Sequence, residues 1–286
     1  MKSRRSISAT HFLKVGFLAG ACSFAVGCSK EANFGKRSKD AKEAEWDEPL
    51  TPSDRAGTEK RVYALLGGYL SCKNDEKNAA TTVGSRMSLI LSDLATVLKN
   101  TGKDDPISLV SCYSWDATNI TYAMSSDPSK IVTSTVDEMI ATFNGLLDGV
   151  EKPKLYIVGH SYGGWTSMKI ATNLTANAKM AALITVDPIS KENCTPNTII
   201  NYVNSQPDSR CKEPPADFGP EKIDEIARRT DLWLNVYQTD FAALHSGPIS
   251  AAQNLLKTYP TSNFSHSTVI DDPDIRDNIK NVLTAD

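Results

Sequence analysis

Apolar residues in this chain occur in short continuous runs, separated by segments with helical spacing. The runs predict strands over residues 61–67, 107–115, 154–159, 181–187 and 231–238. A continuous run indicates a strand buried on both faces, because a half-exposed strand alternates apolar with polar residues. Helical spacing predicts helices over residues 87–100, 131–150, 161–174 and 273–284, the last beginning at Asp272-Pro273.

Strands alternating with helices predict an α/β fold, a mainly parallel sheet flanked by helices on both faces. The segment 188–230 is less regular and contains Pro196, Pro207, Pro214, Pro215 and Pro220. It is too long for a simple connection, so we expect an irregular, cap-like segment over a site.

The first 60 residues show a different pattern. Basic residues precede a thirteen-residue apolar run, VGFLAGACSFAVG, which is too short to span a bilayer but suits a secretory signal. The run leads through small residues into Cys28, which resembles the lipobox of bacterial lipoproteins; Cys22 is a competing position that leaves a very short apolar region. The resemblance implies a signal peptide over 1–28 and a lipid, including palmitate, on Cys28. Ser29 rather than aspartate after that cysteine implies a place in the outer membrane of the bacterial cell envelope.

Residues 29–60 are rich in charge and poor in apolar side chains, which predicts a flexible tether before a domain over 61–286. The whole chain has 40% hydrophobic and 23% charged residues, an ordinary globular balance. A net charge of −3 shows no basic excess, which argues against nucleic acid as a partner. Metal-ligand spacing and dinucleotide glycine patterns are missing from the sequence, so we expect neither a metal nor a cofactor.

The strongest chemical motif is Gly159-His160-Ser161-Tyr162-Gly163, a Gly-x-Ser-x-Gly pattern between a predicted strand and a predicted helix. In that context the pattern marks a nucleophilic serine on a sharp turn. The domain therefore resembles an α/β-hydrolase. The resemblance implies a sheet that begins at the usual third strand of that fold, and it implies Ser161 as the nucleophile.

A serine nucleophile needs a general base, and the chain has four histidines. His11 lies in the predicted signal, and His160 precedes Ser161 in an orientation expected to point away from the serine hydroxyl. The family places the base between the last strand and the final helix, which favours His266. His245 is expected to shape the wall of the site or to bind substrate.

The acid of the triad has two candidates, each at the end of a predicted strand. Asp187 ends the strand after the nucleophile, and ITVDP resembles a lipase-like subset of the family; Asp240 ends the next strand, the position most of the family uses. We favour Asp187 and keep Asp240 as the alternative. The resemblance also implies backbone N–H donors to an oxyanion from Tyr162 and from Gly68 or Tyr69.

Setting Cys28 aside, the exported chain has Cys72, Cys112, Cys194 and Cys211, an even number that suggests two disulfides. Four cysteines allow three pairings. The resemblance favours Cys72–Cys112, between neighbouring strands, and Cys194–Cys211, within the cap-like segment.

These features predict a membrane-tethered serine hydrolase that cleaves small-molecule or lipid carboxylic esters through an acyl-enzyme, as an esterase or lipase. Peptidase, thioesterase or acyltransferase chemistry uses the same triad, and a non-catalytic surface-binding lipoprotein is the alternative from another class. The sequence leaves the substrate and the oligomeric state open.

Overall fold

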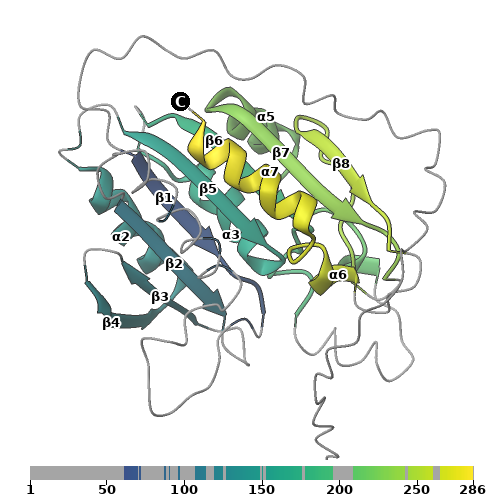
Figure 1. The fold of residues 1–286 in the computed structure, drawn as a ribbon, viewed down its shortest axis with the longest axis horizontal. Helices are drawn as coiled ribbons and strands as arrows, with labels where there is room; N and C mark the ends of the chain where they lie inside the picture. Colours follow the sequence, from purple (N-terminus) through teal and green to yellow (C-terminus); the bar gives the residue numbers. More distant parts are fainter. Residues whose placement is uncertain are drawn as a thin grey trace, which may run out of the picture. The chain divides into compact units, whose positions relative to one another are not determined.

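The computed structural model describes one α/β unit within the predicted domain 61–286 (Figure 1). The described residues are 61–69, 71, 87, 90, 96, 107–113, 119–124, 127–148, 150, 153–175, 178–195, 209–241, 244–259 and 265–285. The predicted signal, Cys28 and the tether over 29–60 lie outside these residues, as does Cys72. Within the described part of the chain, no helix is both long and apolar enough to cross a membrane.

Eight strands form a single sheet in the described residues. They are β1 (Arg61–Leu66), β2 (Ile107–Tyr113), β3 (Ile120–Met124), β4 (Asp127–Ser134), β5 (Lys154–His160), β6 (Met180–Val186), β7 (Thr230–Gln238) and β8 (Gln253–Lys257). The helices are α2 (Val136–Leu147), α3 (Tyr162–Thr172), α5 (Pro220–Arg228), α6 (Ser265–Thr268) and α7 (Pro273–Thr284), with a short 3-10 turn, η2 (Ser209–Cys211).

The strand order is β4-β3-β2-β1-β5-β6-β7-β8. Strands β2, β1, β5, β6, β7 and β8 pair in parallel, whereas β3 pairs antiparallel with both β2 and β4. The predicted mainly parallel sheet is therefore confirmed. Parallel order also brings the carboxyl ends of β1, β5, β6 and β7 to one edge of the sheet, where α/β proteins build their sites.

Side chains of the sheet alternate between two hydrophobic cores, one on each face. On β1, Val62 and Ala64 belong to the core that includes residues of α2, α3 and α5, whereas Tyr63 and Leu65 belong to the core that includes residues of α7. In Figure 1, α7 crosses the near face of the sheet, and α2, α3 and α5 lie behind it. Helices on both faces explain why these strands are apolar at nearly every position.

Three of the predicted elements agree closely with the structure. The helix over 273–284 has the predicted bounds, and Asp272 caps it by accepting hydrogen bonds from the N–H groups of Asp274 and Ile275. Strand β5 and helix α3 flank Ser161 as the motif requires.

The helix predicted over 131–150 was wrong at its start. Residues up to Ser134 belong to β4, and α2 begins only after Thr135, whose side chain and Glu138 form a capping box. The β-branched residues Ile131, Val132 and Thr133 favour a strand, and their apolar spacing also fits a helix.

Five elements of the described residues were not expected from the sequence. Strands β3 and β4 form an antiparallel edge, and β8 forms the opposite edge of the sheet. Helix α5 lies within the segment expected to be irregular; Pro220 begins it, and Ile223 and Ile226 are buried one turn apart. The short helix α6 was also missed.

Candidate active site

Ser161 lies on the sharp junction between β5 and α3. Its backbone has φ 59° and ψ −125°, a left-handed conformation that non-glycine residues rarely adopt. The N–H of Ser161 donates to the carbonyl of Val186 (3.0 Å), which ties the turn to the neighbouring strand β6. A strained, fixed turn of this kind holds a side chain outward from the end of the sheet.

The glycines of the motif are required because other chains approach the turn closely. A Cβ atom on Gly163 would lie 2.0 Å from the carbonyl oxygen of Leu66 on β1. A Cβ atom on Gly159 would lie 2.1 Å from Ser167 Oγ and 2.2 Å from the oxygen of Gly163. The glycines therefore permit β1, β5 and α3 to meet directly behind Ser161.

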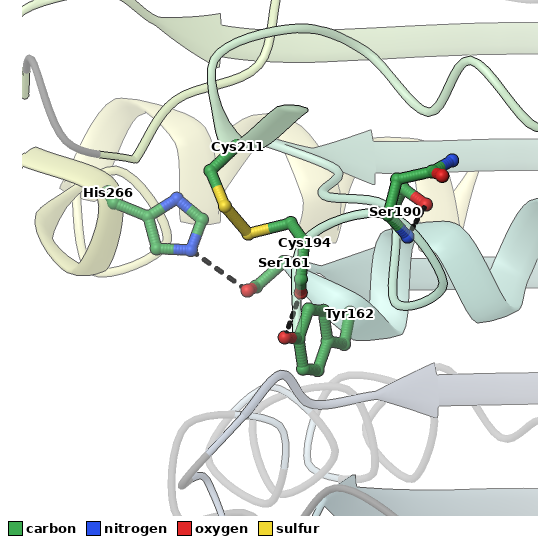
Figure 2. Close-up of a disulfide and its surroundings, with 7 residues drawn as sticks. Ser161, Tyr162, Ser190, Cys194, Cys211 and His266 are labelled. Carbon is green, nitrogen blue, oxygen red and sulfur yellow. Dashed lines mark hydrogen bonds between the residues drawn. A yellow bond between two sulfur atoms is a disulfide. The ribbon is translucent and has the colours of Figure 1, made fainter. Parts of the chain in front are cut away.

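His266 reaches Ser161 from α6, between the last strand and the last helix. Its Nε2 lies 2.9 Å from Ser161 Oγ, and its Nδ1 lies 2.7 Å from Asp187 Oδ2. Figure 2 shows the hydrogen bond between His266 and Ser161 as a dashed line. A carboxylate only accepts hydrogen bonds, so Nδ1 of the neutral ring carries the proton and Nε2 is free to accept from the serine hydroxyl. All three residues are buried or nearly so.

Asp187 follows β6 directly and is fully buried. Its φ of 45° makes it, with Ser161, one of two non-glycine residues with positive φ in the described part of the chain. Oδ1 accepts from the N–H of Ser246 (2.7 Å), and Oδ2 accepts from Gln238 Nε2 (2.7 Å) as well as from His266. The carboxylate is thus surrounded by donors, which stabilise its charged form.

The alternative acid, Asp240, lies apart from this chain of hydrogen bonds. It is exposed, and its Oδ2 accepts from the backbone N–H of Tyr259. Strand β7 ends at Gln238, so Asp240 stands two residues beyond the strand. The position at the end of β7 is occupied by the amide of Gln238, which sequence reasoning did not select.

The other two histidines of the domain have structural contacts. His160 Nε2 donates to the backbone carbonyl of His266 (2.7 Å), and the two rings lie 5.0 Å apart between centroids. His160 therefore contacts the main chain of the candidate base and not the hydroxyl of Ser161. His245 Nδ1 donates to the carbonyl of Ser246 (2.9 Å), beside the N–H that holds Asp187.

Backbone groups beside Ser161 fit the predicted oxyanion donors. Tyr162 is the first residue of α3, where N–H groups have no partner within the helix. Gly68 lies so close that a Cβ atom on it would be 2.5 Å from Ser161 Cβ. Its carbonyl accepts from the N–H groups of Tyr113 (3.3 Å) and Ser71 (3.2 Å), and the trans peptide directs the N–H of Tyr69 to the opposite side.

The predicted disulfide Cys194–Cys211 is present in the structure, and Figure 2 shows it together with Ser161 and His266. The carbonyl of Cys194 accepts from the hydroxyl of Tyr162, and the carbonyl of Cys211 accepts from the N–H of His245 (3.1 Å). Cys112 is also a disulfide cysteine, whereas its predicted partner Cys72 lies outside the described residues.

Buried aromatic residues pack on the helix side of Ser161. Tyr162 contacts Tyr69 and Tyr113, with ring centroids 5.8 Å and 5.6 Å apart. Burial raises the pKa of Tyr162 well above its usual range, and neighbouring Tyr69 and Tyr113 raise it further. The Tyr162 hydroxyl therefore remains a hydrogen-bond donor at any physiological pH.

Among the described residues, no cluster of His, Cys, Asp or Glu is arranged to hold a metal ion.

The sheet order and the strand–Ser161–helix junction define an α/β-hydrolase fold. Strand β1 is the first strand of the described residues yet lies inside the sheet, between β2 and β5, as the usual third strand of that fold does. The edge beyond β2 is filled by β3 and β4, which follow β2 in the sequence. The predicted α/β-hydrolase fold is confirmed, whereas the predicted reduced N-terminus concerns residues before Arg61, which lie outside the described residues.

Comparison with known proteins finds similar solved structures at low identity. The ydeN gene product of B. subtilis has a TM-score of 0.41 and 12% identity, over 79% of this chain and 99% of that one. A putative hydrolase from Agrobacterium vitis S4 has a TM-score of 0.40 and 15% identity, over 80% and 90% of the two chains. Mouse alpha/beta hydrolase domain-containing protein 10 has a TM-score of 0.36 and 13% identity, over 81% and 91%.

No protein-family model matches the chain, and no curated protein matches it. Because the identities and TM-scores of the solved structures are low, the fold assignment rests on the strand order and the connectivity described above.

Proposed function

We propose that this protein is a serine hydrolase that cleaves carboxylic esters through an acyl-enzyme. One observation carries the proposal: Ser161 Oγ, His266 and Asp187 form a continuous chain of hydrogen bonds at the carboxyl edge of the sheet, with distances of 2.9 Å and 2.7 Å. A serine, a histidine and a buried carboxylate in this order constitute the geometry of nucleophilic acyl transfer.

In the first half of the reaction, Ser161 Oγ attacks the acyl carbon while His266 Nε2 takes the hydroxyl proton. Asp187 holds the ring through Nδ1–H and stabilises the imidazolium that forms. The N–H of Tyr162, with that of Gly68 or Tyr69, stabilises the negative charge on the former carbonyl oxygen. The tetrahedral intermediate then collapses; the C–O bond to the leaving alcohol breaks, and His266 returns the proton to that alcohol.

In the second half, water attacks the acyl group on Ser161 while His266 takes a proton from the water. Collapse of the second intermediate breaks the bond to Ser161 Oγ, and His266 returns the proton to the serine. The products are a carboxylic acid and an alcohol. Each step uses groups that the described residues supply, so the reaction needs no metal or cofactor from the protein.

The test is active-site labelling with a fluorophosphonate, which phosphonylates an activated serine. We expect labelling of the wild-type protein and none of Ser161→Ala. Ser167→Ala is the matched control, because Ser167 is a buried serine of α3 whose hydroxyl donates to the carbonyl of Gly163. If the wild-type protein does not react, or if Ser161→Ala reacts equally, the protein is not a serine hydrolase.

Unlabelled protein from a preparation that reacts with the probe can then be compared on p-nitrophenyl esters of graded acyl length, which distinguishes an esterase from a lipase. Turnover of short, soluble esters alone supports an esterase, and a preference for long chains supports a lipase. Labelling without turnover of any ester would favour a peptidase, thioesterase or acyltransferase instead.

We further propose that Cys28 carries a lipid that tethers the domain to the bacterial envelope. The proposal rests on the sequence alone. Cys28→Ala should abolish partitioning of the expressed protein into the detergent phase, and unchanged partitioning would contradict the anchor.

A further inference from the structure

Gln238, the last residue of β7, lies at the centre of the hydrogen-bond network around the candidate acid. It is fully buried, with 0% of its surface exposed. Its Nε2 donates to Asp187 Oδ2 (2.7 Å) and to the carbonyl of Leu244 (3.0 Å). Its Oε1 accepts from Ser265 Oγ (2.6 Å) and from the N–H of Phe241 (2.9 Å).

These four contacts use the full hydrogen-bonding capacity of a side-chain amide. They also fix which way the amide points. The nitrogen must face the carboxylate of Asp187, which only accepts, and the oxygen must face the N–H of Phe241, which only donates. A fully satisfied buried network of this kind has one arrangement, and rotating the amide would leave several buried groups without partners.

The network contacts both the candidate acid and the segment that carries the candidate base. Gln238 contacts Asp187, and it also contacts Ser265, the residue directly before His266. Both Gln238 Nε2 and His266 Nδ1 donate to the same oxygen, Asp187 Oδ2. The backbone N–H of Gln238 additionally faces Asp187 Oδ1 at 3.5 Å.

We propose that Gln238 is a positioning residue that fixes the Asp187 carboxylate relative to His266, an inference that rests on the proposed function. The carboxylate of Asp187 is held by Gln238 on one oxygen and by Ser246 on the other, so it cannot rotate away from the imidazole. The amide is neutral, and it leaves the full negative charge of Asp187 to stabilise the imidazolium. A cation in its place would neutralise that charge.

Gln238→Glu tests this role because it keeps the shape of the side chain and replaces the donating NH₂ with a carboxyl oxygen. While the introduced carboxyl group is protonated, it donates to Asp187 as the amide does. When that proton is lost, two carboxylates face each other and the arrangement breaks. We expect the maximum rate of fluorophosphonate labelling to fall by about 10-fold or more at high pH, where the wild-type rate stays level.

Several ionisable groups surround this position in the described residues. Asp187 and His266 share its network, His245 precedes the Ser246 that holds Asp187, and Tyr259 follows β8. Because all of them are present in both proteins, only the new carboxyl distinguishes the pH profile of Gln238→Glu from that of the wild type.

Asn235→Asp is the matched control. Asn235 lies on the same strand, is equally buried, and bonds through its amide to Thr185, Gly247 and Asn254. It contacts neither Asp187 nor His266 in these bonds. The same amide-to-acid change there should lower stability while the labelling rate keeps the wild-type pH profile.

Gln238→Met provides a second variant, of similar length and without a charge. It should lower the maximum labelling rate about 10-fold at every pH while the half-saturating probe concentration remains unchanged. The proposal is overturned if Gln238→Met labels at the wild-type rate, if Gln238→Glu keeps the wild-type profile, or if Asn235→Asp shows the same alkaline loss. Failure of the wild-type protein to label would instead overturn the proposed function.

Discussion

Asp187 and Asp240 both follow strands at the carboxyl edge, yet their surroundings differ greatly. Asp187 is fully buried, and its oxygens accept from His266, Gln238 and Ser246. Asp240 is exposed and accepts from the backbone of Tyr259. A carboxylate that orients a histidine must be fixed and shielded from water, which only Asp187 satisfies.

We therefore predict that Asp187→Asn lowers the fluorophosphonate labelling rate by about 10³-fold or more, because the amide no longer favours the tautomer with a proton on Nδ1. Asp240→Asn is the control and should change the rate by less than about twofold. The labelling rates of the two purified variants measure the difference. A larger loss of rate in Asp240→Asn than in Asp187→Asn would assign the role of the acid to Asp240.

Gly68 has no room for a side chain, because Ser161 and His160 lie close beside it. A Cβ atom there would lie 2.5 Å from Ser161 Cβ and 3.0 Å from both Ser161 Oγ and the carbonyl oxygen of His160. Gly68→Ala must displace either Ser161 or the loop that carries the proposed oxyanion donor. We expect labelling to slow by about 100-fold.

The control for that prediction is Gly145→Ala in α2, where a Cβ atom would have no neighbour within 4 Å. It should leave labelling unchanged and raise stability by roughly 0.5–1 kcal/mol, because alanine favours a helix interior over glycine. Equal labelling rates for the two alanine variants would show that Gly68 does not constrain the site.

Ser161 and His266, the candidate nucleophile and base, could be selected from the sequence, because a motif marks Ser161 and the chain offers only four histidines. The acid remained a choice between two strand ends, since sequence shows where a strand stops but not which side chain lies opposite it. Gln238 carried a weak signal: a polar amide at the end of an otherwise apolar strand. Its proposed role follows from its four hydrogen-bond partners, which cannot be read from the strand pattern.

At the scale of elements, the disulfide Cys194–Cys211 joins the segment after Asp187 to the turn η2 before α5. Its two carbonyls hold the Tyr162 hydroxyl and the N–H of His245. Each of those residues adjoins a part of the candidate site, Tyr162 beside Ser161 and His245 beside Ser246. The disulfide therefore stabilises the fold and supports the site.

We predict that the double variant Cys194→Ala/Cys211→Ala loses roughly 3 kcal/mol of unfolding free energy, the value expected for a loop of this length. Labelling of Ser161 should also slow, because both supported residues gain freedom. Urea denaturation and labelling of the double variant measure the two effects. Mutation is preferable to a reductant, since Cys112 also takes part in a disulfide. An unchanged urea midpoint would contradict this account.

Strongly apolar strands and helix α7 were predictable, whereas the short edge strands and the start of α2 were not. Helix α7 has a proline at its start and a capping aspartate, signals that fix its bounds in the sequence. Strand β8 is only half-buried along its length, and β3 and β4 pair as an antiparallel edge. Strand β3 is only five residues long, and β4 and β8 each carry several polar residues, so local pattern did not separate them from loops or helices.

For the whole molecule, the alternation of buried strands and helices sufficed to predict a parallel sheet covered on both faces. The order of the strands was not predicted, since periodicity alone cannot say which strand neighbours which. The position of β3 and β4 at the sheet edge beyond β2 could not be anticipated, because pairing between strands depends on contacts distant in sequence.

Buried tyrosines in the core make the stability of the folded protein depend on pH in the alkaline range. Burial raises the pKa of Tyr113 above its usual range, an effect that its hydrogen bond with Thr166 partly offsets. Burial likewise raises the pKa of Tyr162. The unfolded chain releases these protons near pH 10, roughly the ordinary tyrosine value, whereas the folded protein retains them. The stabilisation is complete below that pH and is lost as the pH rises toward the raised folded values.

We therefore predict that the free energy of unfolding falls above about pH 10, by up to about 1.4 kcal/mol per pH unit for each tyrosine. Urea denaturation between pH 8 and pH 11 measures the slope. Tyr113→Phe should be less stable at pH 8, because its bond to Thr166 is lost, and its stability should decline less steeply above pH 10, because one fewer proton is released on unfolding. Parallel curves for Tyr113→Phe and the wild type would exclude Tyr113 as a source of the alkaline loss.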